Sequence, residues 1–420
     1  MVRKSSPAGP PLSLADAHAL GRLGFDSVTG VTSLVEAVHR TIAGLTPPLG
    51  ASPQGGAGGI SGFVYSTVRG VTRLAGGGWK AIGAMLPDAG GKLDPRREAW
   101  VAAINGVFGE HLAKTANPLA VAMQFRHEGR ALSLETDALR KTIGNDRGKL
   151  VVLLHGLCMN DLQWQRQGHD HGRMLADRLG FVPLYLYYNS GRHVSENGRE
   201  FAALLARLVD AWPEPVEELV LVGHSMGGLL ARSACHYAEL EKLAWRKKLK
   251  RIVFLGTPHQ GAPLERAGSH VDLVLELSPY LAPFARLGKS RSAGIKDLRH
   301  GNVLDEDWSH PDNTATRDHR HPLPLPAGVR CHALAASLQE APVKSAKRAR
   351  GDGLVPVASA LGEHANSAFH LTFAAKDSHV VYGCSHFDLL ARDEVAGKLL
   401  AWCGEVTGRA LKVGAGATAT

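Results

Sequence analysis

The chain has 420 residues, a hydrophobic fraction of 44% and a formal net charge of +9, which suits one large globular domain with an appendage. Its five widely spaced cysteines argue against a disulfide framework and against a zinc ligand set, and no apolar run is long enough for a spanning helix. The basic runs lack interleaved aromatic residues and nucleic-acid motifs, so no nucleic-acid partner is expected.

Residues 1–94 are predicted to form a helical, Gly-rich appendage. Apolar residues recur at helical spacing over 31–45 and 60–74, and the segments 28–34 and 68–74 are alike. This region is expected to pack on the main domain or on a second copy of the chain. The alternative is attachment to a membrane or to a lipid or polymer granule, which is favoured by the lack of acidic residues between Ala37 and Pro87. With no apolar leader at the N-terminus, we expect a cytoplasmic protein, with residues 28–87 as the candidate surface contact.

The main domain is predicted to span residues 95–420, with a disordered tail from about 413 to 420. Pro95 opens a helix with one apolar side. The run 151–154 is typical of a buried parallel strand, and the loop His155-Gly156-Leu157 follows it. A loop at the end of such a strand can supply a backbone N–H group to an oxyanion hole, and we select that of Leu157. His155 is then expected to brace the loop.

A second strand-like run, 219–222, leads into Gly223-His224-Ser225-Met226-Gly227 and then a helical segment. Strand, G-x-S-x-G and helix in this order predict a nucleophile elbow, because an attacking serine must stand clear of the backbone on a tight turn. Gly223 and Gly227 leave room where the helix and the strand crowd together. Ser225 is the predicted nucleophile, and the N–H of Met226 is the second oxyanion donor. The alternative is a tight turn with an idle serine.

The expected order after the serine is acid and then histidine. We select Asp352, in Gly351-Asp352-Gly353, which follows the strand-like run 329–335, and His386, which follows the run 380–382 and precedes a helix expected over 387–402. His379 is the weaker alternative for the base, because it precedes that apolar run. Weaker alternatives for the acid are Asp305, Asp307 and Asp312, and Asp388 lies too close to His386.

About 60 residues separate Gly261 from the strand at Val329, so an insert is predicted over about 262–328. Its apolar residues between 271 and 287 form either a helical lid over the site or an extra core helix. The stretch 305–321 is rich in Asp and His but lacks metal-ligand spacing. No metal and no organic cofactor are predicted.

Several of these motifs together resemble the bacterial lipases and esterases of the α/β-hydrolase superfamily. The chain is most similar to the group with a Gly-Thr-Pro-His-x-Gly motif, here 256–261, which inositol-deacylase-like and triacylglycerol-lipase-like hydrolases share. Segments 188–191 and 195–198, the Asp352 loop and the His386 loop also match, and the resemblance covers roughly residues 115–405. It implies the α/β-hydrolase fold, with a mostly parallel sheet and helices on both faces.

The resemblance also implies hydrolysis of an acyl ester or lipid through an acyl-enzyme. Three alternatives stay open: transfer to another alcohol or cleavage of a storage polyester on the same triad, an inactive granule or membrane scaffold, and a lipid-binding module. The sequence leaves the substrate and the oligomeric state undetermined.

Overall fold

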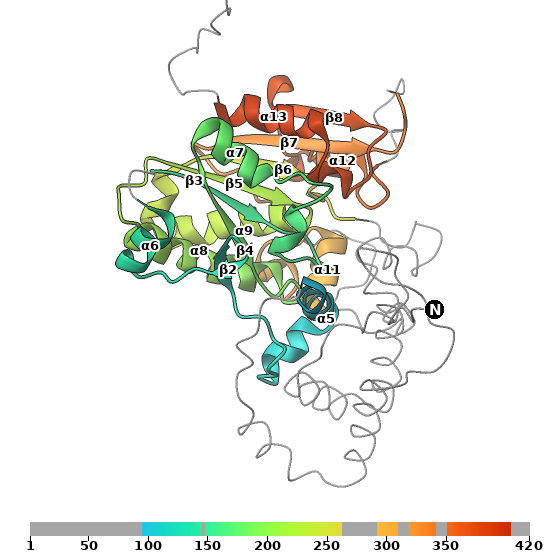
Figure 1. Cartoon of the computed structure of the whole chain (residues 1–420). Coiled ribbons are helices and arrows are strands. Elements are labelled where there is room, and N and C mark those ends of the chain that lie inside the picture. The colour runs from blue at the N-terminus through green and yellow to red at the C-terminus, as the bar shows by residue number, and fades with distance from the viewer. Residues whose placement is uncertain (1–94, 145–147, 263–291, 310–318, 342–350, 405–420) are drawn as a thin grey trace, which may run out of the picture.

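The computed structural model describes residues 95–144, 148–262, 292–309, 319–341 and 351–404 (Figure 1). The predicted appendage helices, residues 271–287 of the insert, Asp312 and the tail lie outside these residues. The domain boundary at residue 95 therefore stays a prediction. No helix within the described ranges is both long and apolar enough to cross a membrane.

The described strands form one eight-stranded sheet in the order β2-β1-β4-β3-β5-β6-β7-β8. β1 is antiparallel to both of its neighbours, and all other pairs are parallel. The strands are β1 (Gln124–His127), β2 (Arg130–Ala131), β3 (Lys149–Leu154), β4 (Val182–Tyr187), β5 (Glu218–His224), β6 (Leu249–Leu255), β7 (Arg330–Ser337) and β8 (Ser378–Tyr382). The central strands each contain an apolar run, 150–154 in β3, 219–222 in β5 and 252–255 in β6, because both faces of the sheet are buried there.

Helices cover both faces of the sheet. The α-helices are α5 (Pro95–Lys114), α6 (Thr136–Ile143), α7 (His171–Leu179), α8 (Val194–Ala211), α9 (Met226–Leu240), α11 (Ala293–His300), α12 (Val357–Ala360) and α13 (Asp393–Gly404). Short 3₁₀ turns are η1 (Asp161–Trp164), η2 (Ala244–Lys247), η5 (Asp305–Asp307), η7 (Ser367–Phe369), η8 (Ala375–Asp377) and η9 (Asp388–Leu390). The core between the sheet and α8 and α9 is separate from the core beneath α7 and α13. This architecture confirms the predicted fold class.

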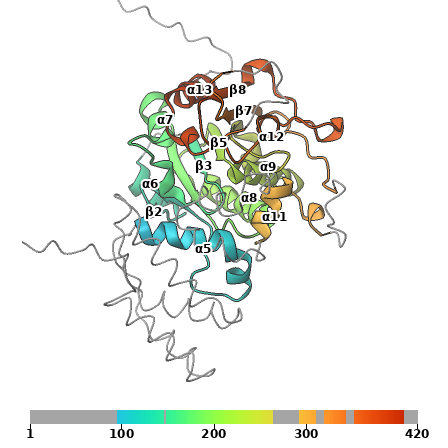
Figure 2. The ribbon, with the colours of Figure 1, turned by 90° about the vertical axis from the view of Figure 1, so that its right-hand side faces the viewer.

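A third core joins α5 to the loops that follow β3 and β5. The apolar side of α5, with Trp100 and Ile104, packs in one cluster with Leu157 and Met226. Figure 2 shows α5 beside α11, the described helix of the insert. The predicted helix at Pro95 is therefore confirmed, and it covers the edge of the sheet where the candidate site lies.

The last helix differs from the prediction of 387–402. The chain first makes the short turn η9, and α13 begins only at Asp393. The carboxylate of Asp388 accepts hydrogen bonds from the backbone N–H and the hydroxyl of Ser385, at 3.0 and 2.6 Å, and so caps the turn. Asp393 and Glu394 then favour a new helix N-terminus at this point.

Candidate active site

Ser225 lies at the tip of the turn between β5 and α9. Its backbone has φ 55° and ψ −123°, a region that residues other than glycine rarely adopt. A Cβ at Gly227 would lie 2.1 Å from the carbonyl oxygen of Leu154, and one at Gly223 would lie 2.5 Å from the nitrogen of Gly228. Both glycines are therefore required for the close approach of α9 to β3 and β5.

His386 and Asp352 meet although 34 residues separate them. The Nδ1 of His386 lies 2.6 Å from Oδ2 of Asp352, and both residues are buried. The other oxygen, Oδ1, accepts hydrogen bonds from the N–H groups of Leu354 and Val355 at 2.9 and 2.8 Å. The carboxylate is thus held rigidly, and it orients the imidazole. Nε2 of His386 is buried and has no hydrogen-bond partner among the described residues.

His224, the residue before Ser225, connects the elbow to the His386 loop. Its Nε2–H donates to the backbone carbonyl of His386 at 3.1 Å, and the two rings lie 4.7 Å apart between centroids. Burial holds the pKa of His224 well below its usual value, so the ring is neutral and donates through one nitrogen. The turn that carries Ser225 and the loop that carries His386 are therefore directly bonded.

The loop after β3 lies against the elbow on its other side. A Cβ at Gly156 would approach Cβ of Ser225 to 3.1 Å. His155 donates from Nδ1 to the carbonyl of Gly156 at 2.8 Å and accepts at Nε2 from the N–H of Tyr188 at 3.4 Å. Burial lowers the pKa of His155 to about 4. His155 therefore braces the loop as a neutral ring, in keeping with its predicted role.

Segment 189–191 and α5 hold the same loop from outside. The hydroxyl of Ser190 accepts a hydrogen bond from the N–H of Cys158, which has φ 61°. A Cβ at Gly106 of α5 would lie 2.1 Å from Sγ of Cys158. Loop bonds engage the N–H groups of Cys158 and Met159, whereas no loop or turn bond within the described ranges engages that of Leu157.

A buried charge cluster, which the sequence did not indicate, supports this arrangement. The guanidinium of Arg126 in β1 donates to Glu98 of α5 at 2.8 Å and to Asp161 of η1 at 2.9 Å, and it lies over the ring of Tyr187. Glu98 and Asp161 lie 28 and 35 positions from Arg126 along the chain, so no local motif joins the three residues. The cluster ties α5 to the turn that follows the β3 loop.

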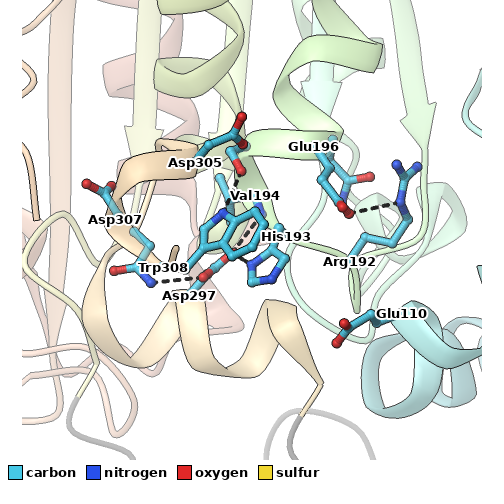
Figure 3. A network of polar contacts seen from close by, with 12 residues as sticks. Glu110, Arg192, His193, Val194, Glu196, Asp297, Asp305, Asp307 and Trp308 are labelled. Carbon is cyan, nitrogen blue, oxygen red and sulfur yellow. Dashed lines mark hydrogen bonds and ion pairs between the residues drawn. The ribbon is translucent and has the colours of Figure 1, made fainter. Parts of the chain in front are cut away.

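A second network holds the described part of the insert against α8 (Figure 3). Asp297 of α11 is fully buried and accepts hydrogen bonds from Nδ1 of His193 at 2.9 Å and from the N–H of Val194 at 2.8 Å. The ring of His193 stacks on Trp308, whose indole N–H donates to the hydroxyl of Ser195 at 2.9 Å. Residues 193–195 lie close after β4, so the insert is anchored near the site edge of the sheet.

The alternatives for acid and base have other partners. Nε2 of His379 lies 2.6 Å from the carboxylate of Glu394, and Asp305 pairs with Arg199. Asp307 accepts hydrogen bonds from the N–H groups of Val303 and Leu304. Among the described residues no group of three His, Cys, Asp or Glu side chains is placed to hold a metal ion.

Residues 146–323 match the family described as the PGAP1-like alpha/beta domain. Among solved structures, naproxen esterase from Bacillus subtilis is 13% identical, with 62% of this chain and 84% of that chain covered and a TM-score of 0.34. An esterase from Thermogutta terrifontis is 14% identical, with 62% of this chain and 91% of that chain covered and a TM-score of 0.35. A lipase-esterase related protein from Clostridium acetobutylicum is 12% identical, with 61% of this chain and 95% of that chain covered and a TM-score of 0.32. No curated protein matches the chain significantly.

The matched segment contains the loop after β3, the turn that carries Ser225 and the Gly-Thr-Pro-His-x-Gly motif. It also contains the strands β3, β4, β5 and β6, which lie side by side in the sheet. The Asp352 and His386 loops follow it in the chain and complete the same edge of the sheet. Residues 146–323 are therefore similar to the PGAP1-like alpha/beta domain, and the chain has the α/β-hydrolase fold.

Proposed function

We propose that the protein is a serine carboxylic-ester hydrolase with Ser225 as nucleophile, His386 as general base and acid, and Asp352 as the orienting carboxylate. The observation that carries this proposal is the buried pair of Asp352 and His386. Nε2 of His386 has no hydrogen-bond partner among the described residues. The loop that carries His386 is hydrogen-bonded to His224, the residue before Ser225. A serine, an imidazole and an orienting carboxylate in this relation are the parts that acyl transfer requires.

In the proposed reaction, Nε2 of His386 takes the proton of Ser225 as the hydroxyl oxygen attacks the ester carbonyl. The N–H groups of Leu157 and Met226 stabilise the tetrahedral oxyanion, and each such donor contributes about 3 to 4 kcal/mol in comparable sites. His386 then protonates the leaving alcohol, which leaves an acyl group on Ser225. Water attacks the acyl-enzyme by the same steps and releases the acid.

The proposed substrate is an acyl ester or a lipid. Two alternatives would use the same three residues. In acyl transfer, an alcohol takes the place of water in the attack on the acyl-enzyme. In cleavage of a storage polyester, the substrate is a polymer. The proposed contact with a membrane or granule surface falls on residues 28–87, outside the described ranges.

The test is hydrolysis of p-nitrophenyl esters of increasing acyl length by the wild type, Ser225→Ala and Ser233→Ala. Ser233 is a matched control, because it lies on the same helix and its buried hydroxyl has no partner among the described residues. We expect Ser225→Ala to lose turnover by roughly a million-fold and Ser233→Ala to keep it. Equal activity of wild type and Ser225→Ala would show that another group is the nucleophile.

A fluorophosphonate probe followed by peptide mass spectrometry provides an independent measurement. The proposal predicts that the probe phosphonylates Ser225 and that labelling is lost in Ser225→Ala. A folded wild-type protein with neither labelling nor ester hydrolysis would favour the scaffold alternative.

A further inference from the structure

A small pocket lies beside the Gly-Thr-Pro-His-x-Gly loop, between α9 and the insert. Its polar lining comes from Arg232 of α9, His259 and Gln260 of the loop, and Asp307, Arg320 and His321 of the insert. None of Ser225, Asp352 and His386 lines it. The pocket is therefore separate from the proposed triad.

Arg232 is a buried cation without a carboxylate partner in the described part of the chain. The residue is 6% exposed, its Nη2 donates to the carbonyl of Leu323 at 2.6 Å, and its Nε has no hydrogen-bond partner among the described residues. Burial, and after it the positive charge of Arg320, lower the pKa of Arg232 to about 10. A buried charge in this condition is costly unless a counter-ion is supplied.

Asp307 raises the pKa of Arg232, but its oxygens are engaged elsewhere. Oδ2 accepts hydrogen bonds from the N–H groups of Val303 and Leu304, at 2.8 and 2.9 Å, and Oδ1 accepts from the N–H of His321 at 2.8 Å. Asp307 therefore organises the backbone of the insert and does not form an ion pair with Arg232.

His259 adds an unused donor to the same pocket. The residue is 1% exposed, and neither ring nitrogen has a hydrogen-bond partner among the described residues. Its ring packs against Phe254 at 4.7 Å between centroids, and burial holds its pKa well below the usual value. A neutral imidazole has one N–H group, and no described group accepts a hydrogen bond from it.

We propose that this pocket binds a small oxyanion such as inorganic phosphate. The anion accepts hydrogen bonds from Nε–H of Arg232 and from one ring N–H of His259, and it offsets the repulsion between Arg232 and Arg320. Because the lining comes from α9, the β6 loop and the insert, the bound anion holds these three segments together. This inference does not depend on the proposed esterase activity.

The test is titration of the full-length protein, freed of phosphate and sulfate, with inorganic phosphate in a calorimeter. We expect saturable binding of one phosphate per chain and a rise in Tm. Arg232→Met should weaken binding by about 10- to 100-fold, the range for hydrogen bonds to a charged group. Without phosphate this variant should be at least as stable as the wild type, because an unpaired buried charge is removed.

The matched control is Arg246→Met. Arg246 also donates from Nη2 to a backbone carbonyl, that of Ala327 at 2.8 Å, and its Nε is also buried and unpartnered. It lies in η2, beside Glu239 and outside the pocket lining. Phosphate affinity should therefore be unchanged in Arg246→Met, and an equal loss in both variants would overturn the assignment.

A second variant keeps the test decisive if Arg232→Met fails to fold. His259→Phe preserves ring packing against Phe254 and removes the N–H donor, so we expect phosphate to bind roughly tenfold more weakly. Unchanged affinity in this variant would overturn the assigned site. Absence of phosphate binding to the wild type would show that the pocket holds water only, and would overturn the proposal.

Discussion

The carboxylate of Asp352 uses each of its oxygens for a different task. Oδ1 accepts two backbone N–H groups that shape its own loop, and Oδ2 contacts Nδ1 of His386. An amide at this position would keep the first task and lose the second. Its NH₂ group would face Nδ1 and would favour the tautomer with the proton on Nε2, which cannot accept a proton from Ser225.

Asp352→Asn is therefore expected to lower kcat by roughly 10⁴-fold while Tm changes little. Steady-state ester hydrolysis together with thermal unfolding checks both parts. Asp388→Asn is the control, since Asp388 caps Ser385 in the same loop without contacting the ring. A Tm drop that accounts for the whole loss in Asp352→Asn would contradict the orienting role.

The glycines of the elbow give a second test at the level of single residues. Gly227→Ala places a methyl group 2.1 Å from the carbonyl oxygen of Leu154, so α9 must move away from β3. Overpacking of this kind costs about 1 to 3 kcal/mol, and activity should fall because the elbow moves. Gly397→Ala in α13 meets nothing within 4 Å and should stabilise by about 0.5 to 1 kcal/mol.

Urea denaturation of the two alanine variants measures this difference. The opposite signs are the essential result, because both changes add the same methyl group to a helical glycine. If Gly227→Ala were as stable and active as the wild type, the close packing of the elbow would not be required.

The residues of the site differ in how readily a linear sequence reveals them. Ser225, Asp352 and His386 each follow a strand within a short motif, so local pattern and chain order were enough to select them. The cluster of Arg126, Glu98 and Asp161 has no such motif, since each partner lies on a different element. Its members come together only through the packing of α5 on the sheet, which no local pattern describes.

At the level of elements, the buried carboxylate of Asp297 is a main anchor of the described part of the insert. Asp297 accepts hydrogen bonds from His193, from the N–H of Val194 and from the amide of Asn302 at 2.9 Å. Asp297→Ala leaves buried donors without acceptors, and we expect it to lower the free energy of unfolding by about 3 kcal/mol.

Asp305→Ala is the comparison for this prediction. Asp305 pairs with Arg199 in the same region, but both side chains are partly exposed, so its removal should cost less than about 1 kcal/mol. Urea denaturation gives both values. Equal costs would mean that burial of Asp297 does not set the strength of the anchor.

The element boundaries show where sequence patterns were insufficient. The apolar runs of strands β3 and β5 were easy to locate in the sequence. The last helix was predicted to begin at 387, whereas the side chain of Asp388 caps Ser385 and His171 donates from Nε2 to the carbonyl of Leu389 at 2.9 Å. The second bond comes from α7, more than 200 residues earlier, and tertiary contacts of this kind override local helical propensity.

At the level of the whole molecule, the neutral buried histidines make stability depend on pH. Burial lowers the pKa of both His155 and His171 to about 4, against about 6.5 in an unfolded chain. Between these values the unfolded chain binds more protons than the folded one. Their contribution is therefore complete above about pH 6.5 and is lost as the pH falls toward about 4.

Within that window, each of these histidines should lower the free energy of unfolding by about 1.4 kcal/mol for each unit by which the pH falls. Urea denaturation at several pH values between about 7 and about 4.5 measures the slope. In His171→Gln, where this titrating group is absent, the slope should be smaller. A free energy of unfolding that stays constant over the window would contradict the prediction.

The order of the strands has a consequence for synthesis of the protein. Ser225 follows β5, whereas Asp352 and His386 are contributed only after β7 and β8, and the bond from His224 to His386 spans 162 residues. Domains fold as units during synthesis, and the segment with Ser225 is synthesised well before the segment with its proposed base. On the proposed mechanism, an interrupted translation product that stops before β8 has a nucleophile that cannot be activated.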